Sequence, residues 1–158
     1  MPAEYERHGG YLTILDAETG QILVILACGT MNPEKREKYL HFSQEKALRL
    51  FENKDHNTSY ESRDEENLKF AGAIRGEEFI YSFSGPQEDV DEAICISMFY
   101  IFEPSESNRF WFKGEKLLNY YNDVYVRNGF VHKFLSLTRR YNENILMDKI
   151  LRDKGSIL

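Results

Sequence analysis

The residues of this chain that could do chemistry near neutral pH are few and scattered. It has four histidines, which are His8, His41, His56 and His132. None lies at helical spacing from another histidine or from a cysteine, so a preformed zinc site has no support. His41, between Leu40 and Phe42, is a candidate axial ligand to haem. The pattern favours instead a partly exposed histidine on an amphipathic helix.

The two cysteines offer one candidate nucleophile. Cys28 ends an apolar run and precedes Gly29 and Thr30, but nothing in the sequence places a base beside it. Cys95 lies in the most apolar stretch of the chain and is expected to be inert. We interpret both as buried thiols in a reducing cytosol, because a secreted disulfide scaffold would contain more cysteines.

Neighbouring carboxylates occur at Asp64–Glu66, Glu77–Glu78 and Glu88–Asp89. General acid catalysis would require one of them to be desolvated, with a raised pKa. Runs of acids in polar stretches are typically solvated surface instead, and no nucleotide-binding glycine motif is present. The sequence therefore does not indicate an enzyme.

The turn Ser84-Gly85-Pro86 joins a predicted strand to a predicted helix, which is the layout of many phosphate sites. The helix then begins with four acidic residues, Glu88, Asp89, Asp91 and Glu92. These would interact with the helix dipole and repel a phosphate. We expect a structural turn, with Ser84 as the helix cap, Pro86 in the first turn and Glu88 reaching back in a capping box.

Hydrophobic patterning predicts the elements that position these residues. Tyr11–Ala17 and Gln21–Ala27 are β-rich runs around Glu18-Thr19-Gly20, which predicts a hairpin. The second run is apolar almost throughout, as expected of a strand that is covered on both faces. Asn32-Pro33-Glu34 predicts a helix start, and its apolar stripe continues to about Glu52.

The middle of the chain repeats this alternation of strand and helix. Asn53–Glu66 is polar and predicts an exposed, mobile loop. Asn67–Ile74 and Phe79–Phe83 predict a second hairpin, and a helix from Pro86 should stop before Glu103-Pro104. Because Ala93–Phe102 is apolar nearly all round, we expect this helix to be buried on most sides.

The last third is ambiguous over residues 115–135. Leu117, Tyr121 and Val124 have helical spacing, yet Asn128-Gly129 lies between β-formers and is a strong hairpin signal. Because helical spacing continues through Ile150, we favour helices. The segment from 109 to 154 is basic and aromatic, with a net charge of +5, whereas residues 61–92 carry −7. Such an asymmetry can serve a partner, or it can let two parts of one fold attract each other.

Length and composition suggest one soluble domain of 158 residues, with an α+β core over 11–104 and an extension over 105–158. The start of the chain lacks the features of a signal peptide, and the longest apolar run is too short to span a bilayer. We therefore expect a cytoplasmic protein without a membrane partner. The pI near 5.3 argues against nucleic acid as a partner, because nucleic-acid binders are usually basic.

A longer stretch resembles a known family. "FAGAIRGEEFIYSFSGPQEDVDEAI" is similar to the strand-turn-helix of the haem-degrading and haem-binding family, which includes glycolate-operon accessory proteins and a domain attached to cobalamin adenosyltransferases. "LTILDAETGQILVIL" resembles that family's first hairpin, and Lys46-Ala47 its Lys-Ala pair. The likeness covers about residues 11–102. The helix that precedes the first hairpin in the family is absent, and "ACGTMN" departs from its usual Arg-Met-Asp-Gly-Ala-like stretch.

The resemblance implies an antiparallel sheet covered by helices, self-association, and binding of a tetrapyrrole or a similar small ligand. We therefore expect an α+β fold and a non-enzymatic, cytosolic ligand-binding or sensor-like domain that forms a homo-oligomer. The candidate ligand-binding residues are His41, Tyr39, Phe42 and Cys28, with haem as the candidate cofactor. The alternative function is a protein–protein interaction or oligomerisation module that uses the basic aromatic C-terminal segment.

Overall fold

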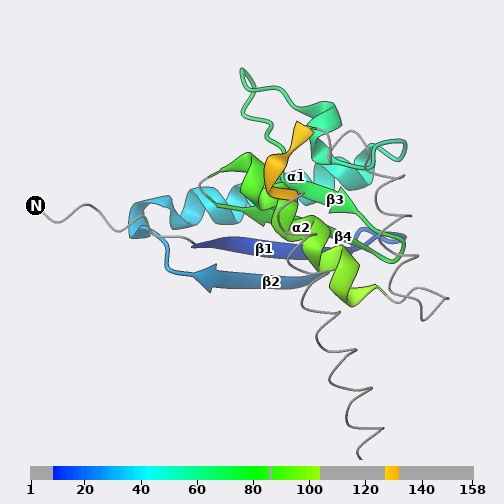
Figure 1. Cartoon of the computed structure of the whole chain (residues 1–158), viewed down its shortest axis with the longest axis horizontal. Helices are drawn as coiled ribbons and strands as arrows, with labels where there is room; N and C mark the ends of the chain where they lie inside the picture. The colour runs from blue at the N-terminus through cyan, green and yellow to red at the C-terminus, as the bar shows by residue number, and fades with distance from the viewer. Residues whose placement is uncertain (1–8, 86, 104–126, 132–158) are drawn as a thin grey trace, which may run out of the picture.

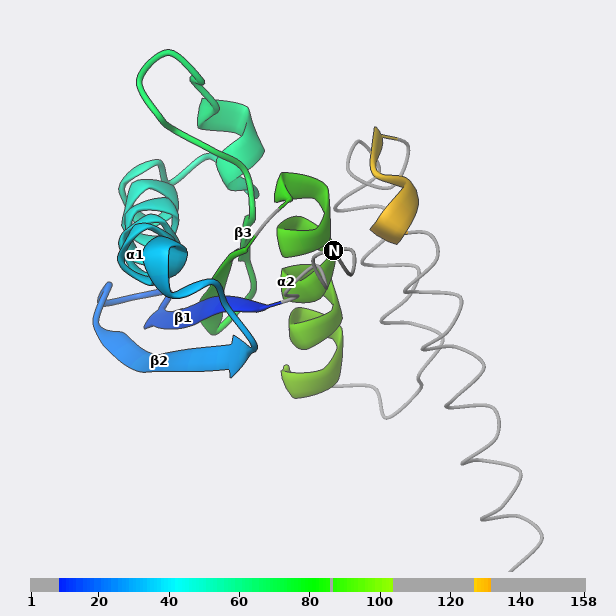
Figure 2. The same cartoon turned by 90° about the vertical axis from the view of Figure 1, so that its left-hand side faces the viewer.

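The computed structural model of the chain describes residues 9–85, 87–103 and 127–131. Four strands form one antiparallel sheet in the order β2-β1-β4-β3, with α1 on one face and α2 on the other (Figures 1 and 2). This confirms the predicted α+β fold of two hairpins covered by helices. The elements are β1 (Gly9–Asp16), β2 (Ile22–Gly29), η1 (Pro33–Lys35), α1 (Arg36–Glu52), η2 (Ser59–Ser62), β3 (Ala73–Arg75), β4 (Phe79–Ser84) and α2 (Glu88–Phe102).

The first hairpin forms where the sequence predicts it. The Asp16 carboxylate accepts hydrogen bonds from the amides of Glu18 (2.9 Å) and Thr19 (2.7 Å), which closes the turn. Gly20 follows at φ +74°, a left-handed conformation that glycine adopts without strain. The turn therefore aligns β1 and β2 in a long antiparallel pair.

The first helix also begins and ends as predicted. The Asn32 side chain accepts a hydrogen bond from the Glu34 amide, and Pro33 starts the short 3-10 turn η1, which leads into α1. The helix ends at Glu52, and the amide of Asn53 donates to the Arg49 carbonyl. Its buried face runs from Phe42 to Leu50, whereas its first turn is exposed.

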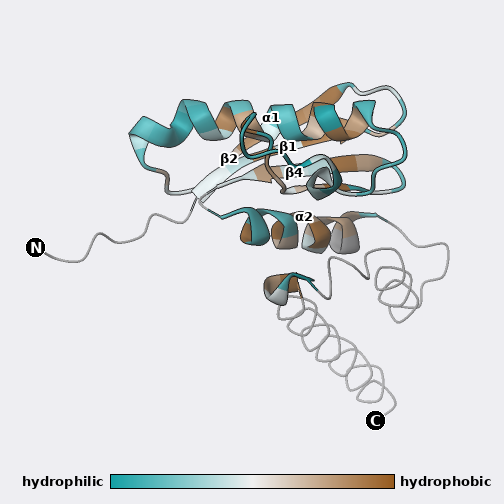
Figure 3. Ribbon diagram, turned by 90° about the horizontal axis from the view of Figure 1, so that it is seen from above, coloured by the Kyte–Doolittle hydropathy of each residue, from teal (hydrophilic) through white to brown (hydrophobic). Residues whose placement is uncertain are grey.

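Strand alternation divides the interior into two cores, one on each face of the sheet. On the α1 face the cluster is Leu15, Ala47, Leu50, Ala73 and Ile80. On the α2 face the buried cluster is Leu12, Ile74, Tyr81, Phe83, Ala93, Cys95, Ile96 and Val131. The result is a three-layer molecule with the sheet in the middle (Figure 3).

The second helix is buried on its sheet side rather than at the centre of the fold. Ala93, Cys95 and Ile96 are buried as expected, but Phe102 is 60% exposed. The predicted cap is wrong: Ser84 belongs to β4, and the N-cap is Gln87, whose side chain makes no capping hydrogen bond. The Glu88 carboxylate is held elsewhere because it interacts with Arg63 and with the Ala71 amide.

The prediction for the second strand is also wrong. Among the described residues neither helix packs along β2, and the side chains from Ile22 to Leu26 are 37–53% exposed. The reason is topological. α1 packs on β1, β4 and β3, and α2 packs on β4 and β3, so β2 is an edge strand beyond the reach of both helices.

The second hairpin is shorter than predicted, because β3 contains only Ala73–Arg75. The loop before it is exposed only in part. Within it, η2 is a 3-10 helix whose Glu61 carboxylate accepts a hydrogen bond from the Thr58 amide at 2.9 Å, and Thr58 and Ser59 are buried. The Arg49 guanidinium bonds the Ser59 carbonyl at 2.9 Å and so attaches the loop to α1.

Most of the predicted C-terminal extension lies outside the described residues. Gly129–Val131 has helical backbone, and the Asn128 side chain accepts hydrogen bonds from the amides of Phe130 (3.1 Å) and Val131 (3.4 Å). This is the pattern of a helix N-cap. Asn128-Gly129 therefore starts a helical turn rather than a hairpin.

Candidate functional site

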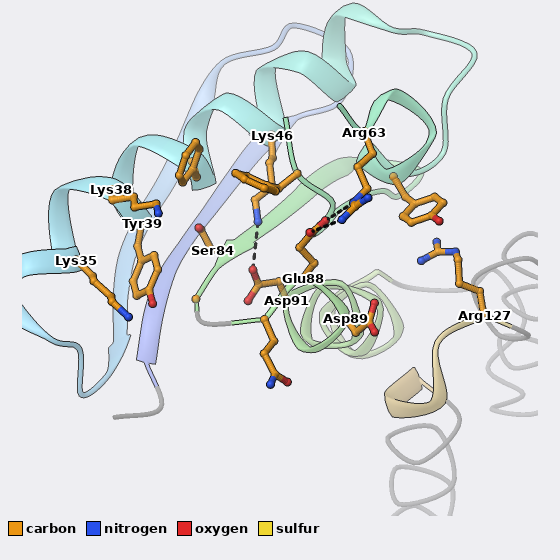
Figure 4. A pocket seen from close by; sticks show the side chains of 15 residues that line it. Lys35, Lys38, Tyr39, Lys46, Arg63, Ser84, Glu88, Asp89, Asp91 and Arg127 are labelled. Atoms are coloured by element: carbon orange, nitrogen blue, oxygen red, sulfur yellow. Dashed lines mark hydrogen bonds and ion pairs between the residues drawn. The ribbon is translucent and has the colours of Figure 1, made fainter. Parts of the chain in front are cut away.

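A cavity of about 840 Å³ opens between the two helices at one end of the sheet (Figure 4). The first half of α1 forms one side, the start of α2 the other, and the end of β4 lies between them. The loop after α1 and Arg127 complete the wall. The lining residues are Lys35, Lys38, Tyr39, Phe42, Lys46, Tyr60, Arg63, Phe70, Ser84, Gly85, Gln87, Glu88, Asp89, Asp91 and Arg127.

A buried ion pair lies at the inner end of this cavity. The Lys46 ammonium of α1 is 3.3 Å from the Asp91 carboxylate of α2, and both side chains are at most 3% exposed. The ammonium also donates to the carbonyls of Ala71 and Phe83. Three acceptors thus use all three donors of Lys46. The pair therefore joins the helices, and Lys46 has no donor left for a ligand.

Burial sets the protonation behaviour of this pair. Desolvation raises the pKa of Asp91 to about 6, and the Lys46 charge opposes that rise. The backbone makes room for the pair at Gly72, which has φ +117°. A β-carbon there would lie 2.5 Å from Lys46 Nζ and 2.8 Å from Asp91 Cβ. Gly72 is therefore required both by its conformation and by the space that the pair occupies.

Two further cations on the cavity wall are already matched to carboxylates of α2. Arg63 contacts Glu88 at 2.9 Å and also pairs with Glu65. Burial acts to raise the pKa of Glu88, but hydrogen bonds from Arg63 and from the Ala71 amide hold that pKa below its ordinary value. On the same side, Arg127 forms a bidentate pair with the buried Glu92, at 3.0 and 3.1 Å.

At the mouth of the cavity, by contrast, the lysines are exposed. Lys35 and Lys38 line it and are exposed, and within the described residues neither has a carboxylate partner. Lys38 Nζ lies 5.7 Å from the centre of the Phe42 ring. That ring packs edge-on against Phe70, with centroids 5.2 Å apart. The mouth thus combines two available positive charges with an aromatic wall.

The structure brings together only two of the four residues that the sequence suggested. Tyr39 and Phe42 line the cavity. His41 is exposed on α1 and does not line it, although its ring lies 5.6 Å from that of Phe42. Cys28 lies on β2 and packs against the core on the α2 face, away from the α1 side of the sheet. Burial raises the pKa of its thiol, which makes it a weaker nucleophile.

Sequence reasoning named Lys46 and Asp91 for other reasons but did not recognise the charged residues of the site. Lys46 could have been found, because it is a lysine on the buried stripe of α1, between Phe42 and Leu50. A lysine in such a position requires an acidic partner, and Asp91 was available on the other helix. Lys35 and Lys38 carried no comparable signal, since exposed lysines are common at the start of a helix.

The cavity wall offers few candidate ligands for haem iron, and among the described residues these are Tyr39 and Tyr60. The part of the cavity wall that the structure describes contains no histidine, cysteine or methionine, which are the usual axial ligands besides tyrosine. Over the same described residues, no group of three metal-ligating side chains lies together. His41 does not line this cavity, so its position gives no support to axial ligation inside it. None of the described helices is long and apolar enough to cross a membrane.

Comparison of the chain with protein-family models, with curated proteins and with solved structures finds no match.

Proposed function

We propose that this chain is a non-enzymatic domain that binds a small organic anion with an aromatic or otherwise apolar body in the cavity between α1 and α2. The observation that carries this proposal is the combination at the mouth of unpaired lysines, Lys35 and Lys38, with the aromatic wall of Tyr39, Phe42 and Phe70. Small-molecule sites combine apolar surface with a few placed polar groups. Here eight of the fifteen lining residues are charged, so the cavity favours a ligand that carries a charged group.

The charges deeper in the cavity also favour an anion over a cation. Glu88 and Asp91 face Arg63 and Lys46, so their negative charge is already balanced. Asp89 is the lining carboxylate without such a pair among the described residues. The unbalanced charge at the mouth is therefore positive, and an anionic group would find it on the α1 side.

Three probes separate the two parts of this recognition. Phenyl phosphate carries a ring and an anion, inorganic phosphate only the anion, and phenol only the ring. Measured by calorimetric titration, phenyl phosphate should bind most tightly, and added salt should weaken that binding. Lys35→Met combined with Lys38→Met should abolish it. Lys54→Met is the matched control, because Lys54 is also exposed and lies over a ring, that of Phe51, outside the cavity.

Two results would contradict the proposal. One is equal binding of phenyl phosphate by the double variant and the parent chain. The other is an absence of binding by all three probes at low salt. A tetrapyrrole remains a candidate ligand, since its carboxylates and flat ring have the same two chemical features. Iron-free protoporphyrin and haem should then bind alike, and His41→Ala should change neither, because His41 lies outside the cavity.

The alternative function, docking of the basic aromatic segment on a partner, has less support. Arg127, which belongs to this segment, pairs with Glu92 of the same chain and lies 3.6 Å from the centre of the Tyr60 ring. At Arg127, therefore, the positive charge of this segment is paired with an acid of the same chain. Docking by the remainder of the segment stays a prediction.

A further inference from the structure

Among the described residues β2 is an edge strand without charged residues or proline, although a register shift opposite Ile14 and Leu15 marks one irregularity in its pairing with β1. Among the residues that the structure describes, its backbone pairs with β1 on one side only, and the N–H and C=O groups of its outer side have no strand partner there. Five successive residues, Ile22 to Leu26, are large, apolar and 37–53% exposed. Gln21–Met31 contains no charged residue and no proline, although charged residues make up 29% of the chain.

The opposite edge of the same sheet shows the contrast. β3 is only three residues long. Thr58 forms a bridge to Ile74, and the Arg75 amide donates to the Asn57 carbonyl at 2.8 Å. That edge is short and blocked by the chain itself. Among the described residues, β2 is therefore the long open edge.

We propose that β2 pairs with β2 of a second copy of this chain about a two-fold axis, which joins two four-stranded sheets into one. A two-fold axis places the same strand antiparallel to itself, so apolar side chains meet apolar side chains without any complementary partner sequence. The pairing would extend the antiparallel order that the sheet already has.

Charge and strand length both favour a second copy as the occupant. Each chain carries a net charge of −6, and the uncharged run Gln21–Met31 lets two copies meet without placing like charges in direct contact. Antiparallel pairing of two strands of this length makes up to about eight backbone hydrogen bonds. A typical protein–protein interface has about ten. The exposed side chains on both faces of β2 would add apolar contact to these bonds.

The inference does not depend on the proposed ligand, because none of the cavity residues lies on β2. Sedimentation equilibrium of the full chain should show a dimer at micromolar concentration. Ile25→Lys would place two like charges near the axis, and it should raise the dissociation constant on the order of a hundredfold or more. Leu68→Lys is the matched control, because Leu68 is an exposed apolar residue far along the chain from β2. It should leave the dimer intact.

Hydrogen exchange identifies the occupant of the edge. In the dimer the β2 amides should be protected, and Ile25→Lys should remove that protection while circular dichroism still shows the folded chain. A monomeric parent chain with protected β2 amides would mean that its own residues outside the described ranges cover the strand. A monomer with unprotected β2 amides would mean a free edge. Either result overturns the proposal, as would a dimer that survives Ile25→Lys.

Disulfide trapping provides a test that does not rely on a disruptive charge. In a Cys28→Ser background, in which Cys95 is fully buried, Val24→Cys, Ile25→Cys and Leu26→Cys, made one at a time, should form inter-chain disulfides under mild oxidation, with the highest yield nearest the axis. A single cysteine at position 68 should not. Equal yields at all four positions would indicate random collision and would contradict a specific β2 pairing.

Discussion

Removal of the Lys46 ammonium provides the sharpest test of how this fold is held together. Lys46→Met keeps most of the side-chain volume but leaves the Asp91 carboxylate, which is 2% exposed, without a counter-charge. It also deprives the carbonyls of Ala71 and Phe83 of a donor. Breaking a buried ion pair by removing one partner costs about 3–5 kcal/mol. A domain of this kind is stable by about 5–15 kcal/mol, so the loss is severe but measurable.

The loss of stability caused by Lys46→Met should depend on pH, and its direction follows from the pKa of Asp91. Its pKa of about 6 in the fold lies above its ordinary value of 3.8. The contribution of this group to stability is therefore complete below pH 3.8 and is lost as the pH rises through about 6, by about 3 kcal/mol. Without Lys46 the folded-state pKa rises further. The penalty of Lys46→Met should therefore be larger at pH 8 than at pH 5.

Urea unfolding followed by circular dichroism at these two pH values measures the effect. Lys38→Met is the control on the same helix, because Lys38 is exposed, and it should change stability by less than about 0.5 kcal/mol. Adding Asp91→Asn to Lys46→Met should remove the pH dependence of the penalty. If Lys46→Met unfolds at the parent urea concentration at pH 8, the buried pair does not join the helices, and the reasoning is refuted.

Three further substitutions test other parts of the framework. Gly72→Ala should destabilise the fold by several kcal/mol, because the new methyl group meets the Lys46–Asp91 pair at a left-handed backbone position. Gly129→Ala is the control, because a β-carbon there has nothing within 4 Å. Equal melting temperatures of the two variants would contradict the packing argument. Glu103→Gln should lower the free energy of unfolding by about 1–3 kcal/mol and speed hydrogen exchange at the amides of residues 77–79, which donate to this carboxylate. Unchanged exchange rates would mean that these hydrogen bonds are dispensable. Arg49→Met should release η2 from α1 and make proteolysis of residues 57–70 faster, whereas an unchanged cleavage rate would show that the loop holds itself.

Local sequence signals predicted the elements whose ends are fixed by neighbouring residues. The turn at Asp16 and Gly20, the start of α1 at Asn32 and the stop of α2 before residue 104 all depend on side chains a few positions away. The capping prediction at Ser84 is wrong, because that residue belongs to a strand. β4 continues through Ser84, and the helix begins only after Gln87.

Predictions that depended on distant packing were less successful. The run Ile22–Leu26 has the composition of a central strand, and no local signal shows that two helices will cover its neighbours and leave it at the edge. The loop after α1 is polar in sequence, yet Arg49 and Arg75 hold it through backbone carbonyls that any sequence would provide. The cavity could not be predicted for the same reason, since its walls come from segments up to about ninety residues apart.

The acidic start of α2 explains how these distant segments come together. Its carboxylates contact cations from three places: Asp91 pairs with Lys46 of α1, Glu88 with Arg63 of the loop, and Glu92 with Arg127. The acids thus attach α2 to three segments of one chain, which accounts for much of the negative charge of this region. Because each of these carboxylates already has a partner, they do not oppose an anion at the mouth of the cavity. Three of the four acids that would repel a phosphate at an isolated helix end are therefore paired, and Asp89 is the one without such a partner among the described residues. This pairing makes an acidic helix start compatible with the anionic ligand that we propose at Lys35 and Lys38.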